Sequence, residues 1–308
     1  QGGDLTLEHC VIELAKNPDL KNYKGQKIIT SQGDTLLGCD DKGGVAIIMA
    51  AAEYIISHKE IPHGQISIAF TPDEEIGAGT DFFELDKFDA DVAYTIDGGK
   101  LGEIEYENFN AACAKIVVNG KSFHPGDSKG KMVNASLLLS ELIEMFPKDQ
   151  TPATTEGYEG FYYLENLIGE CSVAKASILV RDHDREKFEA KKKFIESVVE
   201  KLNEKYGKGT VECQIADTYY NMKEQILPHI YLIENAKKAM ETCGVTPLVV
   251  PIRGGTDGAR LSYMGLPCPN LSTGGHNFHG NQEYVPTKSL EKMVEVVVEL
   301  IKMQEKTK

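Results

Sequence analysis

Residues 65–80 read QISIAFTPDEEIGAGT, and this stretch decides which fold and site the sequence predicts. In residues 65–70, β-branched and aromatic residues alternate with small or polar ones, which predicts a buried strand that Pro72 ends. Glu74 and Glu75 follow directly. Because neighbouring side chains on extended backbone point in opposite directions, one carboxylate can coordinate a metal ion while the other faces an activated water. An isolated DEE is usually an acidic, solvated turn, so the interpretation depends on other segments.

Three other segments place acidic or imidazole side chains just after apolar strands. They are LLGCDDKGG at 36–44, with Asp40 and Asp41, YTIDGG at 94–99, with Asp97, and GGHNFHG at 274–280, with His276 and His279. Asp, Glu and His supply the oxygen and nitrogen ligands that suit zinc or a similar divalent ion. Open α/β sheets place their sites beyond the carboxyl ends of strands. Together the four segments predict a metal site.

The composition excludes several classes of protein. A length of 308 residues fits two domains better than one core, and a hydrophobic content of 41% can build both. The longest apolar runs are far shorter than a membrane span. A net charge of −14 argues against a nucleic-acid or anionic-membrane partner.

The chain has seven cysteines with irregular spacing and no C-x-x-C pair. This usage fits reduced thiols in a cytoplasmic protein better than a disulfide framework. Cys39 directly precedes Asp40, so a nucleophilic role is an alternative to a metal site. No arrangement of His with Asn or Asp surrounds it, and cysteine is commonly a small buried residue, which favours a packing role.

The order of elements predicts an α/β domain that a second domain interrupts. Apolar residues at helical spacing predict a helix over 44–57, and strands are expected at 92–96 and 248–252. Further helices are expected over 229–243, 257–264 and 289–305. This alternation is typical of a largely parallel sheet.

Between these parts the pattern changes. Strands are expected over 112–118, 161–168, 172–180 and 211–217, with helices over 132–146 and 185–206. The order β-α-β-β-α-β is that of the ferredoxin-like split motif. We therefore expect one domain from residues 1–109 and 222–308, with residues 110–221 inserted into it.

Six segments together resemble the M20 metallopeptidase family over nearly the whole chain: GCDDKGG (38–44), FTPDEEIGAGT (70–80), IDGG (96–99), GKSFHPGDSKG (120–130), PIRGGTDGARLS (251–262) and GGHNFHG (274–280). PIRGGTDGA and TEGYEGFYYL (155–164) are similar to its aminotripeptidase subfamily. The resemblance implies an α/β catalytic domain with a mostly parallel sheet and an inserted α+β, ferredoxin-like lid domain. It also implies a metal-dependent aminopeptidase that removes the N-terminal residue from short peptides, above all tripeptides.

The resemblance further implies a dinuclear centre in which two ions share a carboxylate. Asp40 would be the shared ligand, Glu75 and His279 would complete one ion's ligands, and Asp97 would belong to the other. Glu74 would be the general base and later the acid, with a pKa above that of an ordinary Glu where the site excludes water. Zinc, two ions per complete subunit, is favoured by ligand type, and Co²⁺ and Mn²⁺ are also compatible. In this family the peptide bond after the shared Asp is usually cis, so Asp40–Asp41 is expected to be cis.

His276 competes with His279 for the ligand role. The family pattern has its ligand directly before the Gly, which favours His279. His276 is then expected to face solvent or to line the pocket.

Three residues are candidates for substrate binding. In the family the His of the SFHPGDSKG segment, here His124, polarises the substrate carbonyl; the alternative is a loop His held by its neighbours. The guanidinium of Arg253 suits a peptide's terminal carboxylate. Arg181 is a weaker candidate for that carboxylate, and an ion pair with Asp182 or Asp184 is an equal alternative. GGTDGA resembles a phosphate-binding loop but lacks the Lys and the spacing of a P-loop.

The sequence departs from the family at one motif. None of the eight histidines is followed two positions later by Asp, so the family's His-x-Asp motif is expected upstream of Gln1. The chain is then expected to be an N-terminally truncated fragment in which the second ion keeps only Asp40 and Asp97. Such a fragment would bind metal weakly and turn over little.

Two alternative functions remain open from the sequence. One is another M20-type hydrolase, namely a dipeptidase, a carboxypeptidase or an N-acyl amino acid deacylase. The other is a non-catalytic homologue. A short peptide is the expected partner, and a homodimer is compatible with the family, although no exposed apolar strand edge is evident in the sequence.

Overall fold

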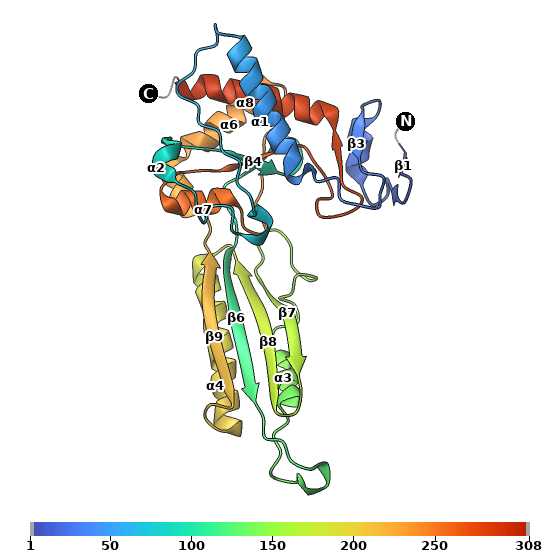
Figure 1. Ribbon diagram of the computed structural model, residues 1–308, viewed down its shortest axis with the longest axis vertical. Coiled ribbons are helices and arrows are strands. Elements are labelled where there is room, and N and C mark those ends of the chain that lie inside the picture. Colours follow the sequence, from blue (N-terminus) through green and yellow to red (C-terminus); the bar gives the residue numbers. More distant parts are fainter. Residues whose placement is uncertain (1–2, 306–308) are drawn as a thin grey trace. The chain divides into compact units, whose positions relative to one another are not determined.

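The computed structural model describes residues 3–305 and divides them into two compact units (Figure 1). Unit 1 contains the described residues of Gln1–Tyr106, Met222–Val250 and Thr256–Lys308. Unit 2 contains Glu107–Asn221 and Pro251–Gly255. No helix among the described residues combines the length and the apolar composition needed to cross a bilayer.

Unit 1 is built on a small mixed sheet. Its strands lie in the order β10 (Leu248–Val249), β5 (Glu103–Glu105), β11 (Asn270–Ser272) and β4 (Thr95–Gly98). The pairs β10–β5 and β11–β4 are parallel, whereas β11 and β5 are antiparallel. Two of the three pairs are parallel, as a mostly parallel sheet requires, and the antiparallel central pair makes the sheet mixed.

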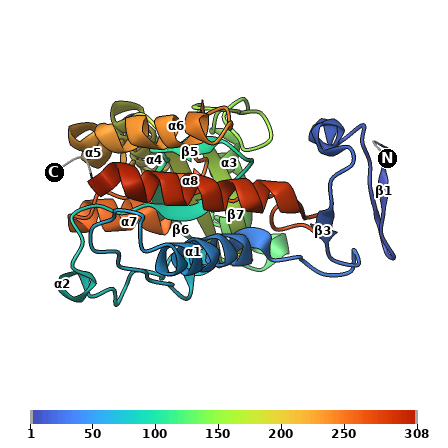
Figure 2. The same ribbon diagram turned by 90° about the horizontal axis from the view of Figure 1, so that it is seen from above.

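Three long helices of unit 1 pack against one another. Figure 2 shows α8 (Thr287–Glu305) between α1 (Cys39–Ser57) and α6 (Tyr231–Thr242), and α8 contacts both. Ala51 and Ile55 of α1 meet Val298 of α8 in one apolar cluster. The shorter helices of this unit are α2 (Leu85–Phe88), α5 (Lys223–Ile226) and α7 (Asp257–Met264), and α7 has the bounds that the sequence predicts.

Two small antiparallel pairs complete unit 1. One joins β1 (Leu5–Thr6) and β2 (Val11–Ile12), and the other joins β3 (Ile28–Thr30) and β12 (Tyr284–Pro286). Short 3-10 helices lie at Pro18–Tyr23, Glu74–Ile76 and Leu227–His229. Strand β12 leads directly into α8, so the loop before it is held by secondary structure at its end.

Residues 65–70 do not form the predicted strand. Ile66, Ile68 and Phe70 are 41%, 44% and 50% exposed, and no described residue pairs with this segment in a sheet. Alternating apolar residues favour extended backbone, but a strand also requires a hydrogen-bonded neighbour. The segment instead lines a cavity of about 1780 Å³ in unit 1.

Helix α1 is present as predicted, but its buried face is different. The sequence pattern places Val45, Met49 and Ile56 on the apolar face, and all three are exposed. The buried positions include Ile47 and Ala51, which lie on the other side of the helix. Ile55, also on the predicted face, is buried, so the prediction is wrong only for the exposed positions, of which Val45 and Ile56 line the same cavity.

Unit 2 has the element order β-α-β-β-α-β. Its elements are β6 (Asn110–Asn119), α3 (Ala135–Glu144), β7 (Phe161–Gly169), β8 (Val173–Asp182), α4 (Arg185–Tyr206) and β9 (Val211–Tyr219). A 3-10 helix, Pro125–Asp127, lies between β6 and α3. The sheet order is β7-β8-β6-β9, and every pair is antiparallel.

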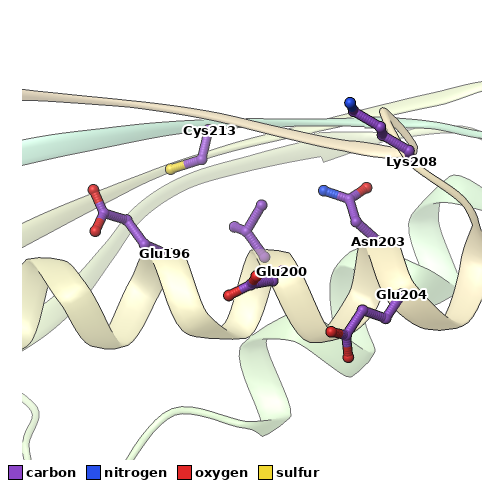
Figure 3. A pocket seen from close by; sticks show the side chains of 7 residues that line it. Glu196, Glu200, Asn203, Glu204, Lys208 and Cys213 are labelled. Atoms are coloured by element: carbon purple, nitrogen blue, oxygen red, sulfur yellow. The ribbon is translucent and has the colours of Figure 1, made fainter.

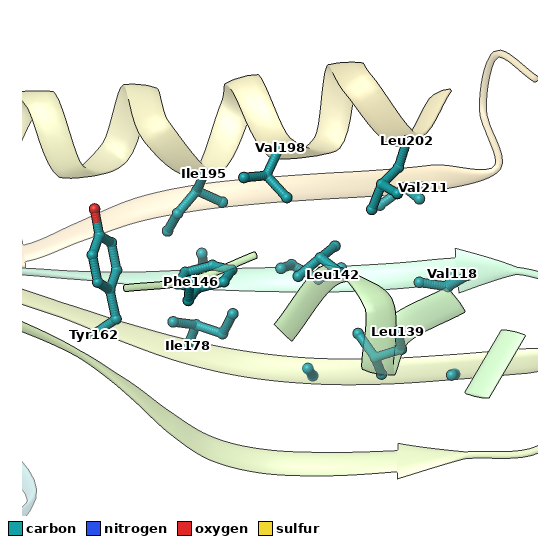
Figure 4. Packing of buried hydrophobic residues seen from close by; sticks show 14 of the residues in the cluster. Val118, Leu139, Leu142, Phe146, Tyr162, Ile178, Ile195, Val198, Leu202 and Val211 are labelled. Atoms are coloured by element: carbon teal, nitrogen blue, oxygen red, sulfur yellow. The ribbon is translucent and has the colours of Figure 1, made fainter. Parts of the chain in front are cut away.

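Both helices of unit 2 cover one face of its sheet, and the apolar core lies between the helices and the sheet (Figure 4). On β6, alternate residues enter this core because successive side chains point to opposite faces. On α4, Ile195, Val198 and Leu202 recur at helical spacing and meet the same core. The side chain of Asp184 accepts the N–H of Lys187 and begins α4 where the sequence predicts.

Strand β7 is an edge strand of this sheet with apolar side chains in solvent. Tyr163, Leu164, Leu167 and Ile168 are all exposed. The structure therefore has an exposed apolar strand edge that is not evident in the sequence. Alternation in residues 161–168 predicts a strand, but it cannot show that the strand has only one neighbour.

Substitutions on α3 of unit 2 test this packing directly. Leu139 and Leu137 lie on α3, and they are 0% and 70% exposed. Leu139→Ala should lower the free energy of unfolding by about 2–5 kcal/mol, because it leaves a cavity between α3 and the sheet. Leu137→Ala should change it by less than about 0.5 kcal/mol. Urea unfolding followed by circular dichroism measures both, and equal effects would contradict the described burial.

Candidate metal centre

Three of the predicted metal ligands, which are far apart in the sequence, come together in unit 1. The ligand atoms of Asp40, Glu75 and His279 all lie within 4.8 Å of one another. The Nε2 of His279 is 2.9 Å from Oδ2 of Asp40 and 3.4 Å from Oε2 of Glu75. One imidazole and two carboxylates at such distances fit one divalent ion and leave a coordination position open.

Asp40 is held at the irregular start of α1. The Asp40–Asp41 peptide bond is cis, as predicted, and both residues have non-helical backbone angles. The carboxylate of Glu283 accepts the N–H groups of Gly38, Cys39 and Asp40, at 2.7, 2.7 and 3.2 Å. The backbone that carries Asp40 is therefore fixed by a side chain far along the sequence.

Glu74 and Glu75 lie on a single 3-10 turn, Glu74–Ile76, and not on the extended backbone that the sequence suggests. Asp73 and Gly77, at the two ends of this turn, have φ of 62° and 70°, and the Gly77 N–H donates to the Glu74 carbonyl. The prediction was wrong because it continued the strand geometry past Pro72. The turn brings Glu75 to His279, and Glu74 interacts with the backbone of Asp257.

His279 and His276 have different surroundings. His279 is exposed, and its φ of 62° is uncommon for a residue with a side chain. His276 is buried, stacks on Tyr284 with ring centroids 4.6 Å apart, and shares a hydrogen bond of 2.8 Å with Tyr23. Burial lowers the pKa of His276 to about 4, so its ring is neutral at neutral pH. The expectation that His276 faces solvent or the pocket was wrong, since the rings of Tyr23 and Tyr284 enclose it.

Further carboxyl groups crowd around Asp40. Burial, together with the charges of Asp41 and Asp40, raises the pKa of Asp97, whose side chain interacts directly with Asp40. Burial also raises the pKa of Asp41 to about 8, although the Gly44 N–H donates to its carboxylate. Like charges in a half-buried space favour a proton or a cation between them. The donor set therefore fits a cation site, in which Asp97 interacts with Asp40 but is not one of the three residues that meet at one point.

Glu74 has the raised pKa that the sequence interpretation expects. Burial, the charges of Asp257 and Glu75, and that of Asp40 raise it to about 7. Asp257 itself is buried, and its carboxylate accepts the hydroxyl of Thr71 at 2.7 Å. A Glu that holds a proton near neutral pH can both accept and donate one.

Cys39 does not have the surroundings of a nucleophile. Its side chain is buried, and burial together with the charge of Glu283 raises the pKa of its thiol to about 12. The thiolate is the reactive form, and it is scarce at neutral pH in this position. All seven cysteines lie in the described part of the chain, and none forms a disulfide.

The three predicted substrate-binding residues lie in unit 2. His124 is exposed, and its Nδ1 accepts the N–H of Gly126. Arg181 donates to the carbonyls of Ala112 and Val180, and its guanidinium lies 5.3 Å from the ring centre of Tyr219. The neighbouring acids have other partners, since Asp182 pairs with Lys191 and Asp184 caps α4.

Arg253 is bound to the segment before β7. Its two terminal nitrogens donate to the carbonyls of Thr155, Gly157 and Glu159 and to the Thr155 hydroxyl, at 2.8–3.2 Å. The guanidinium also lies near the rings of Phe109 and Phe161. These bonds shape the 155–159 segment and involve both terminal nitrogens of the guanidinium.

A separate hollow of about 500 Å³ lies between α4 and β9 in unit 2 (Figure 3). Three of its seven lining residues are acidic, and the lining consists of Glu196, Val199, Glu200, Asn203, Glu204, Lys208 and Cys213. None of the predicted site residues lines it.

Two residues near the cluster were missed by the sequence interpretation. Asp257 stands in GGTDGA, a segment whose sequence suggests a phosphate-binding loop, next to an arginine that suits a substrate carboxylate. Glu283 stands in GNQEYVP, as a single acid before an apolar strand. Glu283 lies between a Gly-rich loop and an apolar strand. An acid at the start of a buried strand needs partners there, and this position could have indicated its role.

Comparison with known proteins shows which proteins this chain resembles. The model of peptidase family M20/M25/M40 matches residues 20–303. Peptidase T of Fusobacterium nucleatum is 52% identical over 305 residues, which cover 98% of this chain and 74% of that protein. The crystal structure of aminopeptidase PepT from Bacillus cereus matches with a TM-score of 0.77 at 28% identity, over 89% of this chain and 74% of its own. A tripeptidase structure from Staphylococcus aureus matches with a TM-score of 0.79 at 24% identity, over 92% and 76%.

Burial of His276 predicts a pH dependence of stability. The folded pKa of about 4 lies below the ordinary value of 6.5, so the unfolded chain binds a proton there that the folded chain does not. The free energy of unfolding should therefore fall as pH decreases from about 6.5 to 4, by up to a few kcal/mol. Two charged groups face the ring. Asp19 raises the pKa of His276 and Lys100 lowers it, so their effects oppose each other.

Urea unfolding at several pH values measures this effect. His276→Phe removes the titrating group and should flatten the curve in that window, even where its overall stability is lower. His63→Gln, at an exposed histidine, should keep the parent's slope. A His276→Phe curve parallel to the parent's would contradict the burial of this ring.

Proposed function

The chain belongs to peptidase family M20/M25/M40, and we propose that it is a metal-dependent aminopeptidase that removes the N-terminal residue from short peptides, above all tripeptides. The observation that carries the proposal is the meeting of Asp40, Glu75 and His279 at one point. The printed names of the relatives support the substrate class, since they are peptidase T, an aminopeptidase and a tripeptidase.

Asp40, Glu75 and His279 would hold one ion, and Asp97 would hold a second through its contact with Asp40. Divalent ions bound there would polarise the substrate carbonyl and lower the pKa of a water molecule. Zinc fits the mixed nitrogen and oxygen ligands, and Co²⁺ and Mn²⁺ fit them as well. We propose a dinuclear zinc centre for the complete subunit.

Glu74 would move the proton. Its carboxyl group stands beside the ligand Glu75 on the same turn, and its pKa of about 7 matches neutral conditions. It would take a proton from the attacking water and give it to the leaving amine. This pairing of a base with a ligand argues against a non-catalytic homologue, which needs neither the proton shuttle nor its raised pKa.

The inserted domain, residues 110–221, would act as a ferredoxin-like lid that carries substrate-binding side chains. His124 would contact the substrate carbonyl, and the guanidinium groups of Arg253 and Arg181 would face its carboxylate. The bonds of Arg253 to the 155–159 segment favour a part in shaping that segment as well. The unpaired cysteines are consistent with a cytoplasmic location.

Hydrolysis of a peptide series by the full-length protein tests the proposal. Tripeptides with a free amino terminus should be cleaved at the first bond, and dipeptides, tetrapeptides and N-acetylated tripeptides should be poorer substrates. Preference for N-acyl amino acids, for dipeptides or for a C-terminal bond would instead identify another M20-type hydrolase. Glu74→Gln should lower kcat about 10²–10⁴-fold, because it removes the proton shuttle.

The matched control is Glu84→Gln, which removes an exposed carboxylate that pairs with Lys87. It should leave kcat unchanged. Release of the amino-terminal residue, measured by chromatography, reports both variants. Equal activity of Glu74→Gln and the parent would contradict the assigned role of Glu74.

We also propose that the protein forms a homodimer through the edge of β7. The exposed apolar side chains of Leu167 and Ile168 stand on a strand with an unpaired edge, and a second copy could pair with it. Ile168→Lys should convert the dimer to a monomer in light scattering after size-exclusion chromatography. Leu137→Lys, at an exposed leucine on α3 of the same unit, should not. A parent that is monomeric at all concentrations would contradict the proposal.

A further inference from the structure

Glu283 is a buried carboxylate that binds backbone. It is 1% exposed, and it stands directly before β12 in unit 1. One oxygen accepts the Gly38 N–H at 2.7 Å, and the other accepts those of Cys39 at 2.7 Å and Asp40 at 3.2 Å. Burying a carboxylate is costly unless hydrogen bonds satisfy it, and three consecutive amides do so here.

These amides need an acceptor because α1 begins irregularly. Gly38 has a left-handed φ of 69° and no side chain to cap the helix. Asp40 and Asp41 depart from helical angles, so a regular first turn does not organise these N–H groups. Glu283 supplies from across the structure the acceptors that a capping residue usually supplies locally.

The same loop also supplies a metal-site residue. His279 lies four positions before Glu283, and the Glu283 N–H donates to the Gly280 carbonyl at 3.1 Å, which closes the turn between them. The loop is thus attached to the 38–40 segment twice. His279 contacts the Asp40 side chain, and Glu283 binds the Asp40 backbone.

Two contacts between the loop and the 38–40 segment restrain Asp40 more than a single contact would. A single contact between His279 and Asp40 would let the Asp40 carboxylate rotate or withdraw with its backbone. The Glu283 bonds hold that backbone in place, so the distance between the two ligands is set by the polypeptide itself. A ligand set that is arranged before the ion binds loses less conformational freedom on binding.

We propose that Glu283 is a positioning residue of the metal centre: its carboxylate holds the 38–40 backbone so that Asp40 meets Glu75 and His279. This inference rests on the proposed function, since it takes these three side chains as ligands. In the described contacts, Glu283 reaches neither the position of the ion nor that of the substrate. It acts through Asp40. Loss of such outer partners typically lowers metal affinity about 10–100-fold.

Titration with Co²⁺, followed by visible absorption and calorimetry, tests the proposal. Glu283→Gln keeps the volume of the side chain but replaces one acceptor oxygen by an amide N–H₂ group, which faces a backbone N–H. It should bind Co²⁺ about 10–100-fold more weakly and shift the cobalt absorption bands, which report ligand geometry. Glu283→Asp keeps both oxygens and should recover part of the affinity and of the parent spectrum.

The matched control is Glu295→Gln, which makes the same chemical change at an exposed pair with Lys292 on α8. It should keep the parent's affinity and spectrum. A purely structural role for Glu283 predicts a lower melting temperature with unchanged affinity and bands, and that result would overturn the proposal. A parent that binds no Co²⁺ would remove the metal centre itself, and with it this inference.

Hydrogen exchange on the unsubstituted protein covers the case in which Glu283→Gln does not fold. In metal-free protein, the amides of Gly38, Cys39 and Asp40 should exchange slowly, because Glu283 already binds them. Slow exchange without Co²⁺ supports the proposal. Rapid exchange that becomes slow only after Co²⁺ is added would show that the ion arranges the segment, and would overturn it.

Discussion

The site depends on one physical constraint, which is that several carboxyl groups share a small, half-buried space. Burial raises the pKa of Asp41, Asp97 and Glu74 together, and each is raised further by its neighbours. Such a group of acids is stable only with protons, cations or hydrogen-bond donors between them. The surrounding elements supply the donors: Gly44 donates to Asp41, and Thr71 donates to Asp257. Much of the irregular backbone in unit 1 serves to bring these hydrogen-bond donors to the carboxyl groups.

The backbone angles near the cluster support this view. Among the described residues other than glycine, positive φ occurs at Asp73, Asp89, Asn277 and His279. Asp73 directly precedes Glu74, and Asn277 lies two positions before His279. Left-handed backbone is uncommon for residues with a side chain and tends to gather at functional sites, where surrounding contacts hold it. Here Asn277 is held by bonds to Asn17 and to the Gln282 carbonyl, so the loop that carries His279 is anchored on both sides.

The sequence predicts those parts whose partners are regular or near in the chain. Helix α4 and helix α7 have the predicted bounds, because their apolar spacing and caps lie within the segment itself. The predicted metal ligands Asp40, Glu75 and His279 do come together, and the sequence pointed to them because their types and order form a motif. Residues 65–70 were predicted wrongly, since strand formation depends on a neighbour that alternation cannot reveal. The burial of His276 and the bonds of Glu283 depend on residues more than 240 positions away, so no local pattern reports them.

Asp40 is where these effects combine. Its carboxylate contacts His279 and interacts with Asp97, and the bond that follows it leads to the half-buried Asp41. In the proposed dinuclear centre Asp40 would be shared between two ions, so a displacement of Asp40 would disturb both sets of contacts at once. A displacement of Glu75 or His279 would disturb only one. The three bonds from Glu283 restrain the backbone at Asp40, and they come from the loop that also carries His279.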